Sequence, residues 1–204
     1  VDTMRPDCRY FDLVRSDAVP RDVPIYIGAT GLTMNKLTGE LVGLGRAEGT
    51  FMNYLIPPSY NERAMEKLEE GVTKHGGSID DVDRPQLIAV SMDEDADVAI
   101  DRARGLATQY IGQQPHIPKA IGIEALAEEI ADELGGWPAS ADDIERASEL
   151  VSDDIVTEIV AAGTPNDCVE KVNDYCETGC TEPVIYSLGD NVKSVIDEFA
   201  EFHT

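Results

Sequence analysis

The sequence has no long apolar run and few basic residues. A membrane-spanning helix needs about 20 consecutive apolar residues, and no stretch of the 204 residues approaches that length. Lysine and arginine together number 16 against 40 aspartates and glutamates, which gives a net charge of −24. Because nucleic acids and anionic lipids attract proteins through basic side chains, this balance argues against both as partners.

Cysteine is also scarce, with four residues at positions 8, 168, 176 and 180. Cys176 and Cys180 are separated by three residues rather than the two typical of zinc knuckles, and no second pair follows. We therefore expect no metal site. The N-terminal residues show no secretion signal, so four cysteines suit a reducing, cytoplasmic location.

The acidic residues are spread along the whole chain instead of forming a tail. Their mutual repulsion destabilises a compact state at low ionic strength, whereas at about 1 M salt the screening length falls to ~3 Å. The composition therefore predicts a cytosol of very high salt, as in extreme halophiles. Residues 80–83 and 93–95 resemble calcium loops only superficially, because they lack the EF-hand glycine and terminal glutamate.

Four near-continuous apolar runs, each bounded by Gly, Pro or Asp, are typical of parallel strands covered on both faces. They span residues 23–27, 50–55, 86–92 and 183–188. Helical periodicity predicts helices over residues 32–44, 59–75, 95–110, 123–134, 140–150, 154–161, 164–177 and 191–202. This alternation predicts an α/β fold with right-handed crossovers. We expect one domain over residues 1–204, with an irregular lead-in at 1–20.

The first predicted strand leads into a glycine turn, Gly28, Ala29, Thr30 and Gly31, and then directly into a helix. Such a junction gathers unpaired backbone N–H groups at the positive end of the helix dipole, which favours an anion such as a cofactor phosphate. The simpler alternative is a strand-to-helix turn that uses glycine only for its backbone angles. The spacing alone leaves both interpretations open.

Residues 23–31, 38–41 and 49–55, taken in order, resemble the central stretch of the luciferase-like flavin and deazaflavin oxidoreductases. Residues 160–165 and 179–189 resemble the final Gly-Thr-Pro helix and last barrel strand of that family. The likeness covers most of residues 20–200 and is greatest for the archaeal deazaflavin-dependent methylenetetrahydromethanopterin reductases.

The resemblance implies a luciferase-like TIM (β/α)₈ barrel, of which this chain is the second half, with four βα units plus extra helices. A complete barrel needs about 250 residues. It also implies that the turn at Gly28 to Gly31 and Asn53 bind the cofactor. The chain departs from the family at residues 40–49, which contain an insertion with Glu48 in place of an Asp. No catalytic residue can be carried over, because the first half-barrel is missing.

The function that the resemblance implies is an oxidoreductase in which coenzyme F420 exchanges hydride with a one-carbon group on a methylenetetrahydromethanopterin-type pterin. Two alternatives remain: an FMN-dependent luciferase-like monooxygenase, and a non-catalytic half-barrel that acts as a binding or dimerisation module. His116, in a polar loop, is a weaker candidate for a ligand contact. Half a barrel exposes strand edges, so we expect a homo-oligomer or a missing N-terminal half-barrel.

Overall fold

The computed structural model describes residues 23–200, so the expected lead-in at 1–20 and Cys8 lie outside the described residues. The strands are β1 (Tyr26–Gly28), β2 (Gly49–Phe51), β3 (Pro85–Met92), β4 (Ala161–Gly163) and β5 (Glu182–Ser187). All the pairings between them are parallel. The expected α/β architecture is confirmed.

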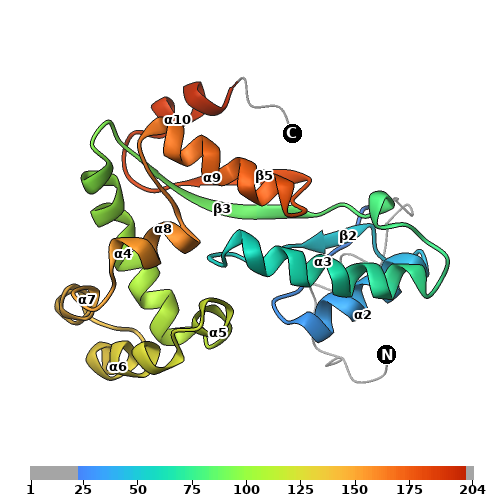
Figure 1. The fold of residues 1–204 in the computed structure, drawn as a ribbon, viewed down its shortest axis with the longest axis horizontal. Helices are drawn as coiled ribbons and strands as arrows, with labels where there is room; N and C mark the ends of the chain where they lie inside the picture. Colours follow the sequence, from blue (N-terminus) through green and yellow to red (C-terminus); the bar gives the residue numbers. More distant parts are fainter. Residues whose placement is uncertain (1–22, 201–204) are drawn as a thin grey trace, which may run out of the picture.

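β3 is the central strand of the sheet (Figure 1). One of its edges pairs with β5. The other edge meets β2 through the bridge Met52↔Gln86 and meets β4 through Val90↔Ala161. β1 extends the layer beyond β2. Because every strand runs the same way, the carboxyl ends of the strands face one rim, as in a barrel wall.

β4 corrects the sequence prediction, which had a helix over residues 154–161 and only four strands. Helix α8 ends at Ile159, and the next three small residues form the strand. A strand of three residues, two of them alanine, is too short and too weakly apolar to show a periodic signal. β1 and β2 also lie slightly displaced from the predicted ranges 23–27 and 50–55.

The helices follow the prediction within a few residues at each end. They are α2 (Leu32–Gly43), α3 (Pro58–Thr73), α4 (Ala96–Gln113), α5 (His116–Ile121), α6 (Glu124–Leu134), α7 (Ala141–Ser148), α8 (Asp153–Ile159), α9 (Pro165–Glu177) and α10 (Val192–Phe199), with a 3₁₀ turn η1 at Ile79–Asp81. α5 is a second correction, because His116 begins a short helix where a polar loop was expected. None of the helices within residues 23–200 combines the length and apolar character that crossing a bilayer requires.

The two faces of the sheet are covered unequally. On one face Ile88 and Val90 pack against Cys168, Val172 and other buried residues of α9. In Figure 1 helices α9 and α10 cover β3 and β5 on this side. On the other face of β5, the side chains of Val184 and Tyr186 are 41% and 49% exposed. This uncovered face is what a partial barrel leaves open.

α2 and α3 pack backbone against backbone through two glycines. A Cβ built on Gly39 would lie 2.1 Å from the Leu68 carbonyl oxygen, and one on Gly71 would lie 2.1 Å from that of Lys36. No side chain fits at either position, so the crossing depends on glycine. This rigid pair supports the turn between β1 and α2.

Arg84 joins three segments at the amino ends of the strands. Its guanidinium donates to the carbonyl oxygens of Gly179 (2.8 Å) and Val82 (2.7 Å) and also to that of Ile79, and its backbone N–H donates to Thr181 Oγ1 (2.8 Å). Burial lowers the pKa of this guanidinium below its usual range. Its Nε and Nη1 thus bond to three carbonyl oxygens, which connect these segments at this rim.

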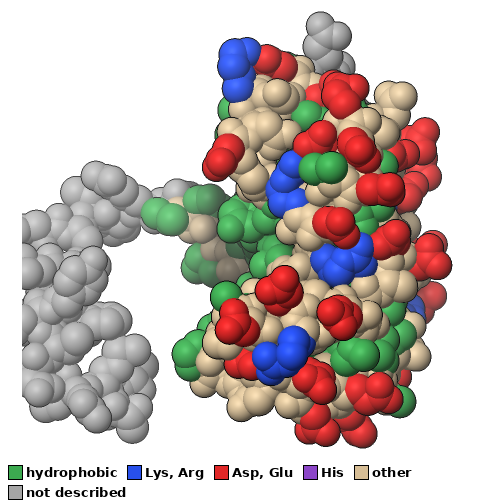
Figure 2. Space-filling view, turned by 90° about the vertical axis from the view of Figure 1, so that its left-hand side faces the viewer, with side chains coloured by type: hydrophobic (Ala, Val, Ile, Leu, Met, Phe, Trp, Pro, Cys, Tyr) green, Lys and Arg blue, Asp and Glu red, His purple; other side chains and the backbone are tan. Residues whose placement is uncertain are grey.

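Acidic side chains dominate the surface. Figure 2 shows Asp and Glu spread over much of the visible face, with few Lys and Arg between them. Asp95 caps α4 by accepting from the Asp97 backbone N–H (3.1 Å), and Asp93 pairs with Arg102 at 2.7 Å. Residues 93–95 therefore provide a helix cap and an ion pair, and in the run 80–83 the Asp83 carboxylate accepts from the Tyr26 hydroxyl at 2.8 Å.

Candidate functional site

The turn between β1 and α2 is open in front of its glycines. Gly31 is the N-cap of α2 and carries no side-chain cap hydrogen bond. A Cβ built on either Gly28 or Gly31 would meet no atom of the described residues within 4 Å. The first-turn N–H groups of a helix have no partner inside the helix. The geometry thus provides an open, amide-rich junction of the kind that binds anions.

Two side chains fix this turn without occupying its N–H groups. The Tyr60 hydroxyl donates to the Thr30 carbonyl oxygen at 2.6 Å, and Asn35 Nδ2 donates to that of Gly31 at 3.1 Å. Ala29, between the glycines, is buried at 3% exposure. Burial raises the pKa of Tyr60, so its hydroxyl stays protonated and keeps donating at neutral pH. The turn is therefore pre-organised.

The Tyr60 ring also holds the positively charged side chain of Arg63 near the turn. The guanidinium carbon of Arg63 lies 5.0 Å from the centre of the Tyr60 ring, in a cation–π contact. Arg63 is exposed, and its Nη2 makes a long contact of 3.5 Å to the Ala120 carbonyl oxygen. The other N–H groups of the guanidinium can therefore donate to a ligand. Neither residue could be assigned to the site from the sequence, because a spacing of three places them on one helix face but does not show which element that face meets.

Asn53 follows β2 and is held in place by its surroundings. Its carbonyl oxygen accepts from Gln86 Nε2 (2.8 Å), and its Oδ1 accepts from the Tyr54 backbone N–H (2.9 Å). Gln86 is itself bound by Asn61 at 2.8 Å. Asn53 Nδ2 is buried and has no hydrogen-bond partner within residues 23–200. A buried donor without an acceptor costs about 1–3 kcal/mol, so a ligand group that accepted from this atom would gain that free energy.

Three tyrosines connect the carboxyl ends of the strands with α4. The Tyr54 ring lies 5.3 Å from that of Tyr110 and 6.3 Å from that of Tyr186, centre to centre, in edge-to-face contacts at 83° and 75°. Burial raises the pKa of Tyr54. Nothing in the sequence spacing indicated this cluster, which brings together residues from β5, α4 and the segment after β2.

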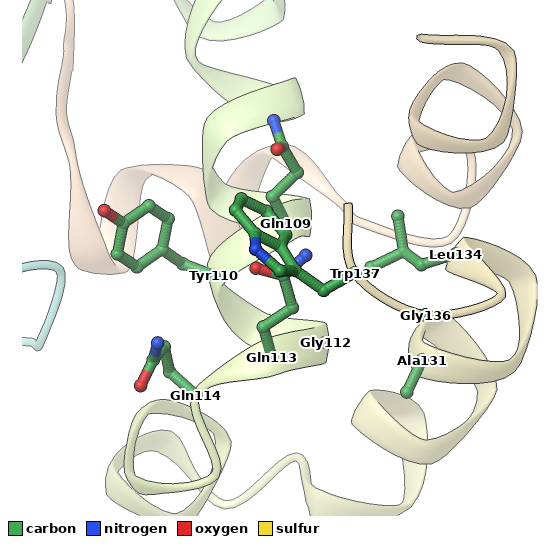
Figure 3. A pocket seen from close by; sticks show the side chains of 9 residues that line it. All are labelled: Gln109, Tyr110, Gly112, Gln113, Gln114, Ala131, Leu134, Gly136 and Trp137. Atoms are coloured by element: carbon green, nitrogen blue, oxygen red, sulfur yellow. The ribbon is translucent and has the colours of Figure 1, made fainter. Parts of the chain in front are cut away.

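A cavity of about 530 Å³ lies beside α4, between this helix and the segment that joins α6 to α7. Its nine lining residues are all uncharged and include Tyr110 of the tyrosine cluster. In the view of Figure 3 the Trp137 indole overlaps the Gln113 side chain, and both residues line the cavity together with Gln109. Gln113 Nε2 is buried and has no hydrogen-bond partner within the described range.

The remaining candidates from the sequence do not gather into a site. His116 begins α5 and is half-buried, and burial lowers its pKa; it does not line the cavity beside α4. Burial raises the pKa of Cys168 to about 12, so this thiol is a packing group on α9. Residues 23–200 contain no cluster of three or more His, Cys, Asp or Glu that could hold a metal ion.

The predicted cofactor residues thus occupy two neighbouring segments of the structure. Gly28, Ala29, Thr30 and Gly31 form the open turn, and Asn53 lies after the adjacent strand β2. Glu48, from the predicted insertion, accepts a hydrogen bond from the Ile25 backbone N–H and so holds the start of β1. Cofactor binding by these residues stays a prediction.

The known proteins to which this chain is similar are oxidoreductases. The 5,10-methylenetetrahydromethanopterin reductase of Methanopyrus kandleri is 30% identical over 179 residues, which are 86% of this chain and 48% of that protein. An F420-dependent glucose-6-phosphate dehydrogenase of Microbacterium testaceum is 26% identical, over 91% of this chain and 48% of that protein. The chain therefore spans about half the length of the curated relatives it matches.

Solved structures show the same fold. The coenzyme F420-dependent tetrahydromethanopterin reductase from Methanopyrus kandleri superposes with a TM-score of 0.73 at 28% identity, covering 88% of this chain and 50% of that one. An F420-dependent secondary alcohol dehydrogenase is alike in fold alone, with a TM-score of 0.64 at 19% identity over 90% of this chain and 48% of that one. The sequence matches the model of the luciferase-like monooxygenase family over residues 4–182. The chain belongs to that family, and its fold is part of a luciferase-like TIM barrel.

Proposed function

We propose that this chain forms part of a coenzyme F420-dependent oxidoreductase that acts on a methylenetetrahydromethanopterin-type one-carbon substrate. The relatives named as methylenetetrahydromethanopterin reductases and as F420-dependent dehydrogenases support this proposal. The single observation that carries it in this chain is the open turn at Gly28 to Gly31, at the carboxyl end of a barrel strand. Active sites of TIM barrels lie at that end.

The residues of the turn would hold the acidic tail of the cofactor. The open space at Gly28 and Gly31 allows a phosphate to approach the backbone, and the start of α2 offers amides and a positive dipole. Tyr60 keeps the turn in shape, and Arg63 adds a cation that neutralises part of the tail. In a chain with a net charge of −24, such a local positive contribution is needed for an anion to approach.

Asn53 would orient the cofactor nearer to its ring. The unpaired Nδ2 is a donor whose direction is fixed by the hydrogen bonds to Gln86 and Tyr54. When bound, the deazaflavin supplies the hydride chemistry, while the protein supplies orientation and electrostatics. We assign no catalytic acid or base to this chain.

We further propose that these 204 residues act as one domain, the C-terminal half of a barrel. The exposed Val184 and Tyr186 indicate a face that an N-terminal half-barrel or a second copy of the chain would cover. The acidic surface supports a cytoplasmic location with high salt. A stable, monodisperse monomer in molar salt, measured by light scattering, would contradict the need for a covering half.

The test of the proposed function is cofactor binding by a glycine variant. Gly31→Val fills the space in front of the turn, and since no described atom lies within 4 Å of a Cβ there, the fold should accept it. We expect its affinity for F420, measured by fluorescence titration, to fall by roughly tenfold or more. Gly105→Ala on α4 is the matched control, because a Cβ there meets only Ile144 at 3.6 Å.

FMN titrated in parallel distinguishes the alternative cofactor. Binding of FMN in preference to F420 would favour the luciferase-like monooxygenase. Absence of F420 binding to the unaltered chain, or equal binding by Gly31→Val, would overturn the proposed role of the turn.

A further inference from the structure

Two fully buried carboxamides join α3 to the central strand β3. Asn61 on α3 is 0% exposed and Gln86 on β3 is 1% exposed. Asn61 Nδ2 donates to Gln86 Oε1 at 2.8 Å, and Gln86 Nε2 has a longer contact, 3.5 Å, with Asn61 Oδ1. Replacing both partners of such a bond by apolar side chains of the same shape can be nearly neutral for stability. Stability alone therefore does not explain why a pair of amides lies here.

Gln86 also acts at the point where the chain leaves the sheet. The bridge between Met52 and Gln86 pairs the backbones of β2 and β3. At the next residue the hydrogen bond comes from the Gln86 side chain, whose Nε2 donates to the Asn53 carbonyl oxygen at 2.8 Å. Gln86 therefore fixes the backbone of Asn53, and its own side chain is oriented by Asn61.

The backbone after Asn53 needs such support. Leu55 has a φ of 55°, in the left-handed region that branched side chains rarely adopt, and it is 3% exposed. A residue in that region is strained, and the strain persists only where the surroundings hold the chain. The Asn53 side chain follows this backbone, because its Oδ1 accepts from the Tyr54 N–H at 2.9 Å. A change of the backbone at residue 53 would therefore redirect the buried, unpaired Nδ2.

The start of α3 holds both segments that contain the predicted cofactor residues. The Tyr60 hydroxyl donates to the Thr30 carbonyl oxygen at 2.6 Å. The next residue, Asn61, reaches Asn53 through Gln86. Because the two connections begin at adjacent residues of one helix, α3 sets the position of the open turn relative to Asn53.

We infer that Gln86 and Asn61 are positioning residues, which hold Asn53 Nδ2 in the direction that a cofactor acceptor requires. The inference rests on the proposed function and adds to it two residues that need not touch the ligand. Both side chains are buried, so they act through the Asn53 backbone and not by contact with the cofactor. The alternative is a merely structural pair, whose removal would affect binding only through the stability of the fold.

The experiment combines these residues with Asn53 in a double-mutant cycle. The variant Asn61→Leu/Gln86→Met replaces both amides by apolar side chains of similar size, so that neither amide is left unpaired, while the Asn53 carbonyl oxygen loses its donor. We expect the F420 affinity of the full chain, measured by fluorescence titration in molar salt, to fall about tenfold. In an Asn53→Ala background the same two substitutions should cause no further loss, because they act through Asn53.

A second measurement needs no cofactor. The side-chain amide of Asn53 should give one pair of NMR signals in the free chain, and this pair should broaden or split in the Asn61→Leu/Gln86→Met variant. The matched control is Thr108→Val/Ser148→Ala, which removes another side-chain pair, 3.2 Å apart, between α4 and α7. Like Asn61, Thr108 is 0% exposed. The control should change neither the F420 affinity nor the Asn53 signals.

The outcomes separate this inference from the proposed function. An equal loss of affinity with and without Asn53 would show a merely structural pair and overturn the inference. Asn53 signals that stay unchanged in the variant would also overturn it, and F420 binding that depends on Gly31 would then leave the proposed function standing. Absence of F420 binding to the unaltered chain, with Asn53 signals that split in the variant, would contradict the proposed function and still support the positioning of Asn53.

Discussion

Two glycine-bearing helices differ in how much room surrounds them. On α2, a Cβ at Gly39 would lie 2.1 Å from the Leu68 carbonyl oxygen, whereas on α4 a Cβ at Gly105 would meet only the Ile144 side chain at 3.6 Å. The α2–α3 pair is thus locked by backbone contact, while α4 meets α7 through side chains with space between them. The rigid pair supports the proposed cofactor turn. The room around Gly105 is local to the contact of α4 with α7, since a Cβ at Gly112, where α4 meets α6, would lie 2.5 Å from the Leu134 side chain.

Alanine at these two glycines should separate the regions most clearly. Gly39→Ala forces two helix backbones apart, so we expect a loss of roughly 3 kcal/mol in the free energy of unfolding. Gly105→Ala replaces a helical glycine where there is room, so we expect a gain of about 0.5–1 kcal/mol. Urea denaturation of both variants measures the difference. Equal effects of the same sign would remove the contrast between the two regions.

Salt should stabilise the whole chain. The repulsion within a net charge of −24 is screened over ~10 Å at 0.1 M salt and over ~3 Å at 1 M. For a chain of this size, each kcal/mol of stability raises Tm by about 2–4 °C. We expect the free energy of unfolding to rise by several kcal/mol between the two salt concentrations, and Tm to rise accordingly. Thermal melts in KCl test this. A Tm that stays constant would contradict the prediction of a high-salt cytosol.

The capping boxes of α9 and α7 allow a second comparison of the two regions, with a smaller expected effect on stability that depends on pH. Thr164 and Asp167 form a capping box on α9, as do Ser140 and Asp143 on α7. Thr164→Ala should cost about 1 kcal/mol at neutral pH. The Thr164 hydroxyl lowers the pKa of Asp167 below its usual range, so the stabilisation is present above the unfolded-state pKa of about 3.9 and is lost as pH falls through the folded-state pKa.

The difference in Tm between the wild-type chain and Thr164→Ala should therefore shrink below about pH 4, while the part due to the Asp167 backbone N–H that donates to Thr164 Oγ1 remains. Ser140→Ala is the counterpart in the looser region. If α7 unfolds separately from the sheet, this variant should change a local transition and leave the main one in place. A pH-independent difference between wild type and Thr164→Ala would show that Asp167 does not contribute through its charge.

Removing the hydroxyl of Tyr60 or of Tyr175 should have the smallest effect on stability, and only the change at Tyr60 should affect F420 binding. The Tyr60 hydroxyl donates to the Thr30 carbonyl oxygen at 2.6 Å, and that of Tyr175 donates to the Ile56 carbonyl oxygen at 2.7 Å. Tyr60→Phe should weaken F420 binding severalfold with a stability loss of about 1 kcal/mol or less. Tyr175→Phe, in the core, should lower stability and leave F420 affinity unchanged.

The sequence predicted the long elements well, for identifiable reasons. α3 and α9 have regular apolar spacing and clear boundaries, such as the capping box at Thr164, and β3 is a continuous apolar run. β4 was missed because three small residues carry no periodic signal. α5 was missed because Pro115, Pro118 and the polar residues around them suggested a loop.

The candidate site was predictable only where it is local in the sequence. Gly28 to Gly31 are contiguous, so their arrangement follows from one strand and one helix. The contacts of Tyr60 with Thr30 and of Tyr54 with Tyr110 join residues 30 and 56 positions apart, which only the fold can bring together. Residue type could suggest that Gln113 and Trp137 were of interest, but their shared cavity depends on how α6 and α7 return to α4.

Arg84 holds the rim of the half-barrel at which the strands begin, whereas the proposed ligand-binding residues lie at the rim where the strands end. Its hydrogen bonds to the backbone of residues 79, 82 and 179 are all made at the strand beginnings, on the opposite rim from Gly28 and Asn53. Substitutions at the carboxyl ends of the strands therefore need not disturb the hydrogen bonds of Arg84. A protein designer could exchange the ligand-facing side chains to alter specificity, provided that the arginine and its carbonyl acceptors are left alone.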